Sequence, residues 1–105
     1  MRQSTYLRKV LKALETAGWW IKAYNDGGDE DFIFGAEDSM RDRISATMDA
    51  AIAVEDIDIY VSNGHHTLFL KAVWQGDDET YEAAEEIVCD YSMPLDKIIS
   101  SVESE

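Results

Sequence analysis

Residues 57–70 read Ile-Asp-Ile-Tyr-Val-Ser-Asn-Gly-His-His-Thr-Leu-Phe-Leu. Apolar side chains alternate with other side chains on both sides of Asn63 and Gly64, and Asn-Gly is the preferred two-residue turn of a β-hairpin. Because successive strand residues point to opposite faces, one face of the hairpin carries the buried apolar side chains. The opposite face carries Asp58, Tyr60, Thr67 and Phe69. A two-residue turn predicts these opposed pairs on the buried face: Ile59 with Leu68, and Ile57 with Leu70.

The elements that precede this hairpin follow from the same kind of pattern. Residues 4–17 place leucine and valine at helical spacing, with Gly18 as the stop. Residues 19–24 are aromatic and branched and predict a strand, and a turn and residues 32–34 complete a first hairpin. Ser39 resembles a helix cap, and a second helix is predicted over residues 40–52, with this inward stripe: Met40, Ile44, Met48, Ala51 and Ile52.

Two more helices are predicted after the second hairpin. Residues 79–91 show a helical apolar stripe, and Asp77 or Asp78 caps it. Pro94 is suited to the first turn of a short final helix with Leu95, Ile98, Ile99 and Val102 inward. The fold class is therefore α+β, a single domain over residues 1–105. A four-stranded antiparallel sheet made of two hairpins packs with helices, in the order helix, strand, strand, helix, strand, strand, helix, helix.

The charge of the chain limits the partners that it can bind. The 105 residues include 22 Asp or Glu and 9 Lys or Arg, a formal net charge of −13. Nucleic-acid binders depend on Lys and Arg for phosphate contacts, so direct nucleic-acid binding is excluded. No apolar run is long enough to span a membrane and no signal-peptide pattern is present, so a cytoplasmic protein without a membrane partner is expected. The single cysteine, Cys89, fits a reducing compartment.

The charge is also unevenly distributed. Residues 1–22 carry five cations and one carboxylate, whereas residues 23–105 carry four cations and 21 carboxylates. This polarity could be satisfied within a subunit, between subunits or by a basic partner.

The predicted helix over residues 79–91 carries the densest group of carboxylates. They recur three or four positions apart on one side, where each like-charge pair costs an isolated helix about 0.2–0.5 kcal/mol. One interpretation is an array of negative charge that a nucleic-acid-binding protein accepts in place of phosphates, and the other is a solvated face that serves solubility. The residues of this row are Asp78, Glu79, Glu82, Glu85, Glu86 and Asp90.

The turn of the first hairpin adds a second acidic group, Asp26, Asp29, Glu30 and Asp31, around two glycines. Its spacing does not match a calcium loop, because Asp31 occupies the position of the required glycine. We expect an acidic hairpin tip that extends the acidic surface rather than a metal site.

No catalytic or metal-binding set is recognisable. His65 and His66 are adjacent on a predicted strand and point to opposite faces, and Cys89 lacks a demonstrable histidine partner. Phosphate-binding, dinucleotide-binding and serine-hydrolase motifs are absent. We therefore expect no catalytic residues, no metal and no cofactor. The alternative of an acid-base or metal-dependent enzyme predicts tight binding of divalent ions.

The chain has more aromatic residues than a sheet with one buried face requires. Either helices cover both faces, or an aromatic surface is left for a partner or a second copy, which allows a homodimer. The candidate residues of this surface are Trp20, Tyr24, Tyr60 and Phe69.

Residues 68–76, Leu-Phe-Leu-Lys-Ala-Val-Trp-Gln-Gly, followed by residues 88–92, Val-Cys-Asp-Tyr-Ser, and by Leu95 and Asp96, resemble the end of small uncharacterised acidic proteins of phages and plasmids. The resemblance covers the last third of the chain. It implies a context in mobile elements, where small acidic proteins resemble inhibitors of host defence, including restriction and CRISPR systems, some of which mimic nucleic acid.

Two functions from different classes follow. The first is a noncatalytic protein-binding protein that presents its acidic residues to a basic surface, such as that of a nucleic-acid-binding protein of host defence. The second is a structural or regulatory module that self-associates through its aromatic surface, with acidity serving solubility alone. Salt-sensitive partner binding supports the first, and salt-insensitive self-association supports the second.

Overall fold

The computed structural model describes residues 2–54, 56–74 and 88–103 of the chain. In these residues three α-helices pack on an antiparallel sheet of five strands, so the mixed helix and sheet class is confirmed. The elements are α1 (Gln3–Thr16), β1 (Trp20–Asn25), β2 (Phe32–Ile33), α2 (Met40–Ala53), β3 (Asp56–Ser62), β4 (Thr67–Val73), β5 (Val88–Tyr91), a 3₁₀ turn (Met93–Leu95) and α3 (Asp96–Glu103).

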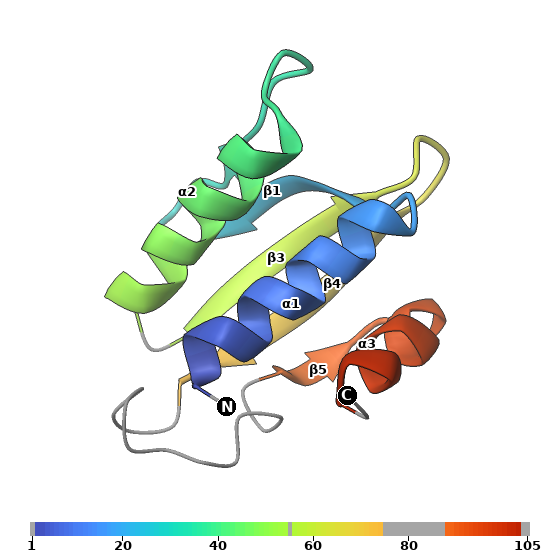
Figure 1. Ribbon diagram of the computed structural model, residues 1–105. Helices are drawn as coiled ribbons and strands as arrows, with labels where there is room; N and C mark the ends of the chain where they lie inside the picture. The colour runs from blue at the N-terminus through green and yellow to red at the C-terminus, as the bar shows by residue number, and fades with distance from the viewer. Residues whose placement is uncertain (1, 55, 75–87, 104–105) are drawn as a thin grey trace.

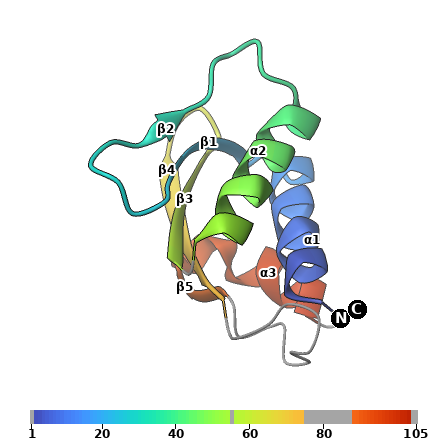
Figure 2. The ribbon, with the colours of Figure 1, turned by 90° about the vertical axis from the view of Figure 1, so that its left-hand side faces the viewer.

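The strand order across the sheet is β2-β1-β3-β4-β5. All three helices lie on the same face, with α1 between α2 and α3 (Figure 1). The view turned by 90° shows this helix layer on one side of the sheet (Figure 2). None of the described helices has the length and apolarity that crossing a membrane requires.

The core lies between this layer and the sheet. The predicted apolar stripe of α1 is fully buried, and Ile57, Ile59 and Leu70 meet it from the sheet. The stripe of α2 is only partly as expected, because Ile44, Met48 and Ala51 are buried whereas Met40 and Ile52 are exposed. The core side chains of α1 are Leu7, Val10, Leu11 and Leu14.

The predicted helix boundaries agree with the local chemistry of the chain. Gly18 adopts a φ of +94° directly after α1, the left-handed conformation that glycine accepts without a Cβ penalty. The Ser39 hydroxyl accepts a hydrogen bond of 3.1 Å from the Asp42 amide at the start of α2. Pro94 lies in the 3₁₀ turn before α3, in which Leu95, Ile99 and Val102 are buried as predicted.

The register of the second hairpin differs from the prediction. Ile59 lies opposite Leu70, and Val61 lies opposite Leu68, so the strands are shifted by two residues and four residues, 63–66, form the connection. The Asn63 carboxamide oxygen accepts the amides of His65 and His66 at 2.9 and 2.8 Å, which stabilises this longer turn. A shift of two residues keeps every side chain on its predicted face.

The prediction of a helix over residues 79–91 is wrong for its last four residues, and residues 79–87 lie outside the described part of the chain. Val88–Tyr91 forms the fifth strand, in which Tyr91 pairs with Leu70 and Asp90 with Lys71. Phe69 and Ser92 extend this pairing, because the Phe69 amide donates to the Ser92 hydroxyl at 3.0 Å and the Ser92 amide donates to the Phe69 carbonyl at 2.9 Å. The sheet therefore has five strands instead of four, and a strand stands where a helix was expected.

The observed register makes a prediction about Leu70 and Leu68. Leu70 is fully buried opposite Ile59, so replacing it with alanine is expected to lower the free energy of unfolding by about 2–5 kcal/mol. Leu68 is half-buried near the turn, and Leu68→Ala should cost clearly less. Urea denaturation of both variants measures the difference. An equal or larger loss for Leu68→Ala would support the two-residue turn instead.

Candidate functional site

The loop between β1 and β2 is held in shape by Asn25 at the end of β1. The Asn25 carboxamide nitrogen donates to the Gly28 carbonyl at 3.2 Å and to the Asp31 carboxylate at 2.9 Å. Its carboxamide oxygen accepts the Gly27 amide at 2.8 Å, and Gly27 has a φ of +100°. One side chain thus satisfies polar groups at three places in the loop and keeps the tip in a defined shape.

The carboxylates of this loop point to solvent. Asp26, Asp29, Glu30 and Asp31 are all exposed, and none of them forms an ion pair with another described residue. The structure thus brings together the four carboxylates that the sequence placed at a hairpin tip. Burial, then the charge of Asp26 and that of Asp49 on α2, raises the pKa of the Tyr24 hydroxyl above its ordinary value.

An apolar edge follows the acidic tip directly. Phe32 is 52% exposed and Ile33 is 69% exposed on the short edge strand β2. The Phe32 ring stacks on Tyr24 with ring centroids 5.2 Å apart, so part of this edge is anchored to the sheet. We call residues 26–33 the acidic tip. Figure 2 shows the connection between β1 and β2 extending away from the side on which the helices lie. Charge and apolar area therefore occur together on one projection of the molecule.

Of the predicted acidic row, the structure describes Asp90 alone, and it places this residue on β5 instead of on a helix. Asp78, Glu79, Glu82, Glu85 and Glu86 lie outside the described residues.

Asp90 is exposed and lies opposite Lys71 in the sheet. On the other side, Lys71 lies 3.6 Å from the Asp58 carboxylate and 3.4 Å from the Asp56 carboxylate. Asp58 and then Asp56 raise the pKa of the Lys71 ammonium. This lysine therefore balances charge on β3, and the described carboxylates of the sheet differ in this respect from those of the acidic tip.

Three of the four predicted aromatic surface residues share the sheet face away from the helices. Tyr60 lies opposite Phe69 with ring centroids 6.3 Å apart, and Trp20 is paired with Ser62 on the same face. The described helices lie on the opposite face of the sheet (Figure 2). Trp20 also lines a cleft with Glu15 of α1 and Arg43 of α2. Trp20 is exposed, whereas Tyr60 and Phe69 are half-buried.

Tyr24 does not share this face. The pairing of β1 with β3 shifts between Ile21 and Ala23, where Lys22 is an extra residue. This bulge reverses the faces of the residues that follow, so Tyr24 pairs with Ile59 on the helix side and feels the charge of Asp49 on α2.

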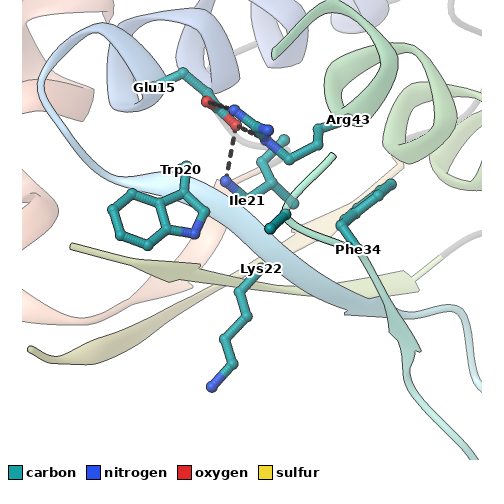
Figure 3. Close-up of a pocket in the computed structure, with 8 residues that line it drawn as sticks. Glu15, Trp20, Ile21, Lys22, Phe34 and Arg43 are labelled. Carbon is teal, nitrogen blue, oxygen red and sulfur yellow. Dashed lines mark hydrogen bonds and ion pairs between the residues drawn. The ribbon is translucent and has the colours of Figure 1, made fainter. Parts of the chain in front are cut away.

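An ion pair between helices lines a cleft of about 580 Å³ (Figure 3). Glu15 of α1 accepts hydrogen bonds from the Arg43 guanidinium of α2 at 2.9 and 2.6 Å and from the Ile21 amide of β1 at 2.8 Å. Arg43 also donates to the Asp38 carbonyl. The Glu15 and Arg43 side chains are only 3% and 16% exposed. Glu15 and Arg43 are hydrogen-bond partners of one another, so their role in this cleft is structural. We call Glu15, Arg43 and the Ile21 amide the joint.

The hydrogen bond from Arg43 to Glu15 outweighs the effect of burial and raises the pKa of the guanidinium. Because the folded pKa is raised, the stabilisation is present below the ordinary pKa of arginine and is lost only as the pH rises beyond it. The Arg43 guanidinium therefore stays charged throughout the neutral range. The sequence showed Glu15 as the one carboxylate among residues 1–22, but no spacing rule connects it to Arg43.

The described residues contain no group of three or more His, Cys, Asp or Glu side chains that could hold a metal ion. His65 and His66 lie in the exposed β3–β4 connection instead of on a strand. Comparisons of the chain with protein-family models, with curated proteins and with solved structures found no significant match. The candidate site consists of the acidic tip and its surroundings.

The joint of Glu15, Arg43 and Ile21 makes a second prediction. Glu15→Ala leaves the guanidinium and the Ile21 amide without their acceptor, so the free energy of unfolding should fall by about 3 kcal/mol. Lys71→Ala is the control, because its ion pairs are exposed and screened by solvent, and it should change stability little. Thermal and urea unfolding at neutral pH measure both. Equal losses for the two variants would contradict the role given to the joint.

Proposed function

We propose that this protein is a noncatalytic binding protein whose acidic surface engages a basic surface on another protein. The observation that carries the proposal is the acidic tip, where exposed carboxylates without ion pairs among the described residues stand on a loop ordered by Asn25. Such groups gain the most from a cationic partner, because no internal counter-charge has to be displaced.

The apolar part of the acidic tip supports the same proposal. Charge accelerates encounter and selects partners, but most of the affinity of an interface comes from buried apolar and aromatic groups. Phe32 and Ile33 supply exposed apolar area next to the carboxylates. The acidic tip therefore combines exposed charge with exposed apolar area, the two features that a protein interface needs.

The partner that we propose is a nucleic-acid-binding protein, with the acidic residues standing in for phosphates. The net charge of −13 supports this, and the acidic row Asp78 to Asp90 would extend the negative surface. The resemblance to phage and plasmid proteins adds that the target is a protein of host defence, of the restriction or CRISPR type, which the protein would inhibit.

Charge reversal tests the acidic tip. Asp29→Lys with Glu30→Lys should weaken binding to a partner captured from the source cell by about tenfold or more, since two attractive contacts become repulsive. Glu37→Lys with Asp49→Lys changes the net charge equally at exposed positions outside the tip and is the matched control. Titrations at low and high salt measure the affinities. Equal weakening by both pairs would show that only net charge matters.

Competition tests the choice of partner. A partner that uses its nucleic-acid site should be displaced from the immobilised protein by duplex or single-stranded nucleic acid at low salt, where nucleic acid binds most tightly. A partner that stays bound in excess nucleic acid at low salt would contradict mimicry while leaving acidic binding intact.

A second candidate function rests on the sheet face away from the helices. Trp20, Tyr60 and Phe69 share this face, which no described helix covers, and they would allow self-association. Trp20→Ala and Phe69→Ala should then reduce the mass measured by light scattering, whereas Met93→Ala, at an exposed apolar side chain elsewhere, should not. A monomeric unmodified protein at high concentration and high salt would contradict self-association.

A further inference from the structure

A groove of about 690 Å³ runs between α1 and α3, on the outer side of the helix layer. Ala13, Ile98 and Val102 give it an apolar floor, and small or polar residues of both helices complete it. Its rim carries Lys9 and Lys12 from α1 and Lys97 from α3. Among the described residues no carboxylate lines it, although Asp and Glu outnumber Lys and Arg in the chain by 22 to 9.

The charge of this groove is thus opposite to that of the molecule as a whole. Lys12 and Lys97 are exposed and form no ion pair within the described ranges. The two lysines stand on different helices, so a chain lying along the groove would pass between them. Because α1 and α3 cover the sheet face opposite to the direction in which the β1–β2 connection extends, the groove is separate from the acidic tip (Figure 2).

We infer that this groove docks an amphipathic helix with acidic flanks, supplied by a partner protein. Two packed helices with small side chains between them offer a seat for a third helix, whose apolar stripe would cover Ala13 and Ile98. Carboxylates on both flanks of that stripe would meet Lys12 on one rim and Lys97 on the other. A basic helix would be repelled by both rims, so the charge selects the chemistry of the occupant.

This surface goes beyond the proposed function, because it binds a partner of the opposite charge on another side of the molecule. With both surfaces in use, the protein would bridge a basic site and an acidic helix, either on two proteins or on two parts of one. Ionic screening makes this compatible with the net charge of −13, because charges farther apart than about 8 Å interact weakly at physiological salt.

The probe is a fluorescein-labelled helical peptide of about 15 residues, close to the length of α1, with leucine at helical spacing and glutamate on both flanks. Two matched control peptides are used. In one, every flanking glutamate is replaced with lysine, and in the other, every leucine is replaced with serine. Fluorescence anisotropy should show saturable binding of the first peptide to the full chain, and at least about tenfold weaker binding of the other two.

Variants locate the binding. Lys12→Glu with Lys97→Glu should weaken the binding of the glutamate peptide by about tenfold or more. Ala17→Trp should block the groove sterically. Lys22→Glu with Arg41→Glu makes the same charge change at exposed positions outside the groove and should have a much smaller effect. Circular dichroism and unfolding midpoints show whether each variant is folded.

Three results would overturn the inference: no saturation by the glutamate peptide at millimolar concentration, equal or tighter binding of the lysine peptide, or equal weakening by the two double variants. None of these results bears on the acidic tip, whose variants Asp29→Lys and Glu30→Lys leave the groove unchanged. Failure of the groove and failure of the proposed function are thus distinguishable.

Discussion

One buried carboxylate connects α1 and α2 with the sheet. Glu15 is near the C-terminal end of α1, where a negative charge opposes the helix dipole, so it is a costly residue unless it is compensated. Arg43 of α2 supplies the counter-charge, and the Ile21 amide at the start of β1 supplies a third donor. One side chain therefore connects two helices and a strand. Gly18 makes this possible, because its positive φ turns the chain sharply from α1 into β1.

The described charges of the molecule differ in whether they form ion pairs. Glu15 and Arg43 form a buried ion pair, and Lys71 forms exposed ion pairs with Asp56 and Asp58. Among the other described charges, the carboxylates of the acidic tip and the lysines around the α1–α3 groove lie on different parts of the molecule. Neither group contributes to stability in an obvious way. Their separation is the basis for proposing two binding surfaces of opposite sign.

Particular elements show how far sequence reasoning could go. The faces of the second hairpin were predicted correctly because the alternation of Ile57, Ile59 and Leu70 is a local property with period two. The register was not, because both candidate registers bury the same face and the choice depends on hydrogen bonds that the His65 and His66 amides donate to the Asn63 side chain. Residues 88–91 fit a helical pattern equally well, but pairing with β4 made them a strand. The bulge at Lys22 turns Tyr24 toward α2, and no residue of β1 predicts this bulge from the sequence.

By itself, the sequence determined the net charge, the buried stripe of α1, the ends of α1 and α2, the faces of the second hairpin and the acidic residues between the first two strands. These properties depend on residues close together in the chain, where period, caps and composition are visible. Only the tertiary structure decided the fifth strand, the register, the partners of Glu15 and Lys71, and the lysine-rimmed groove. Each of these depends on contacts between residues far apart in the chain, and such contacts form because burial and hydrogen bonding favour them jointly over the alternatives that local pattern allows.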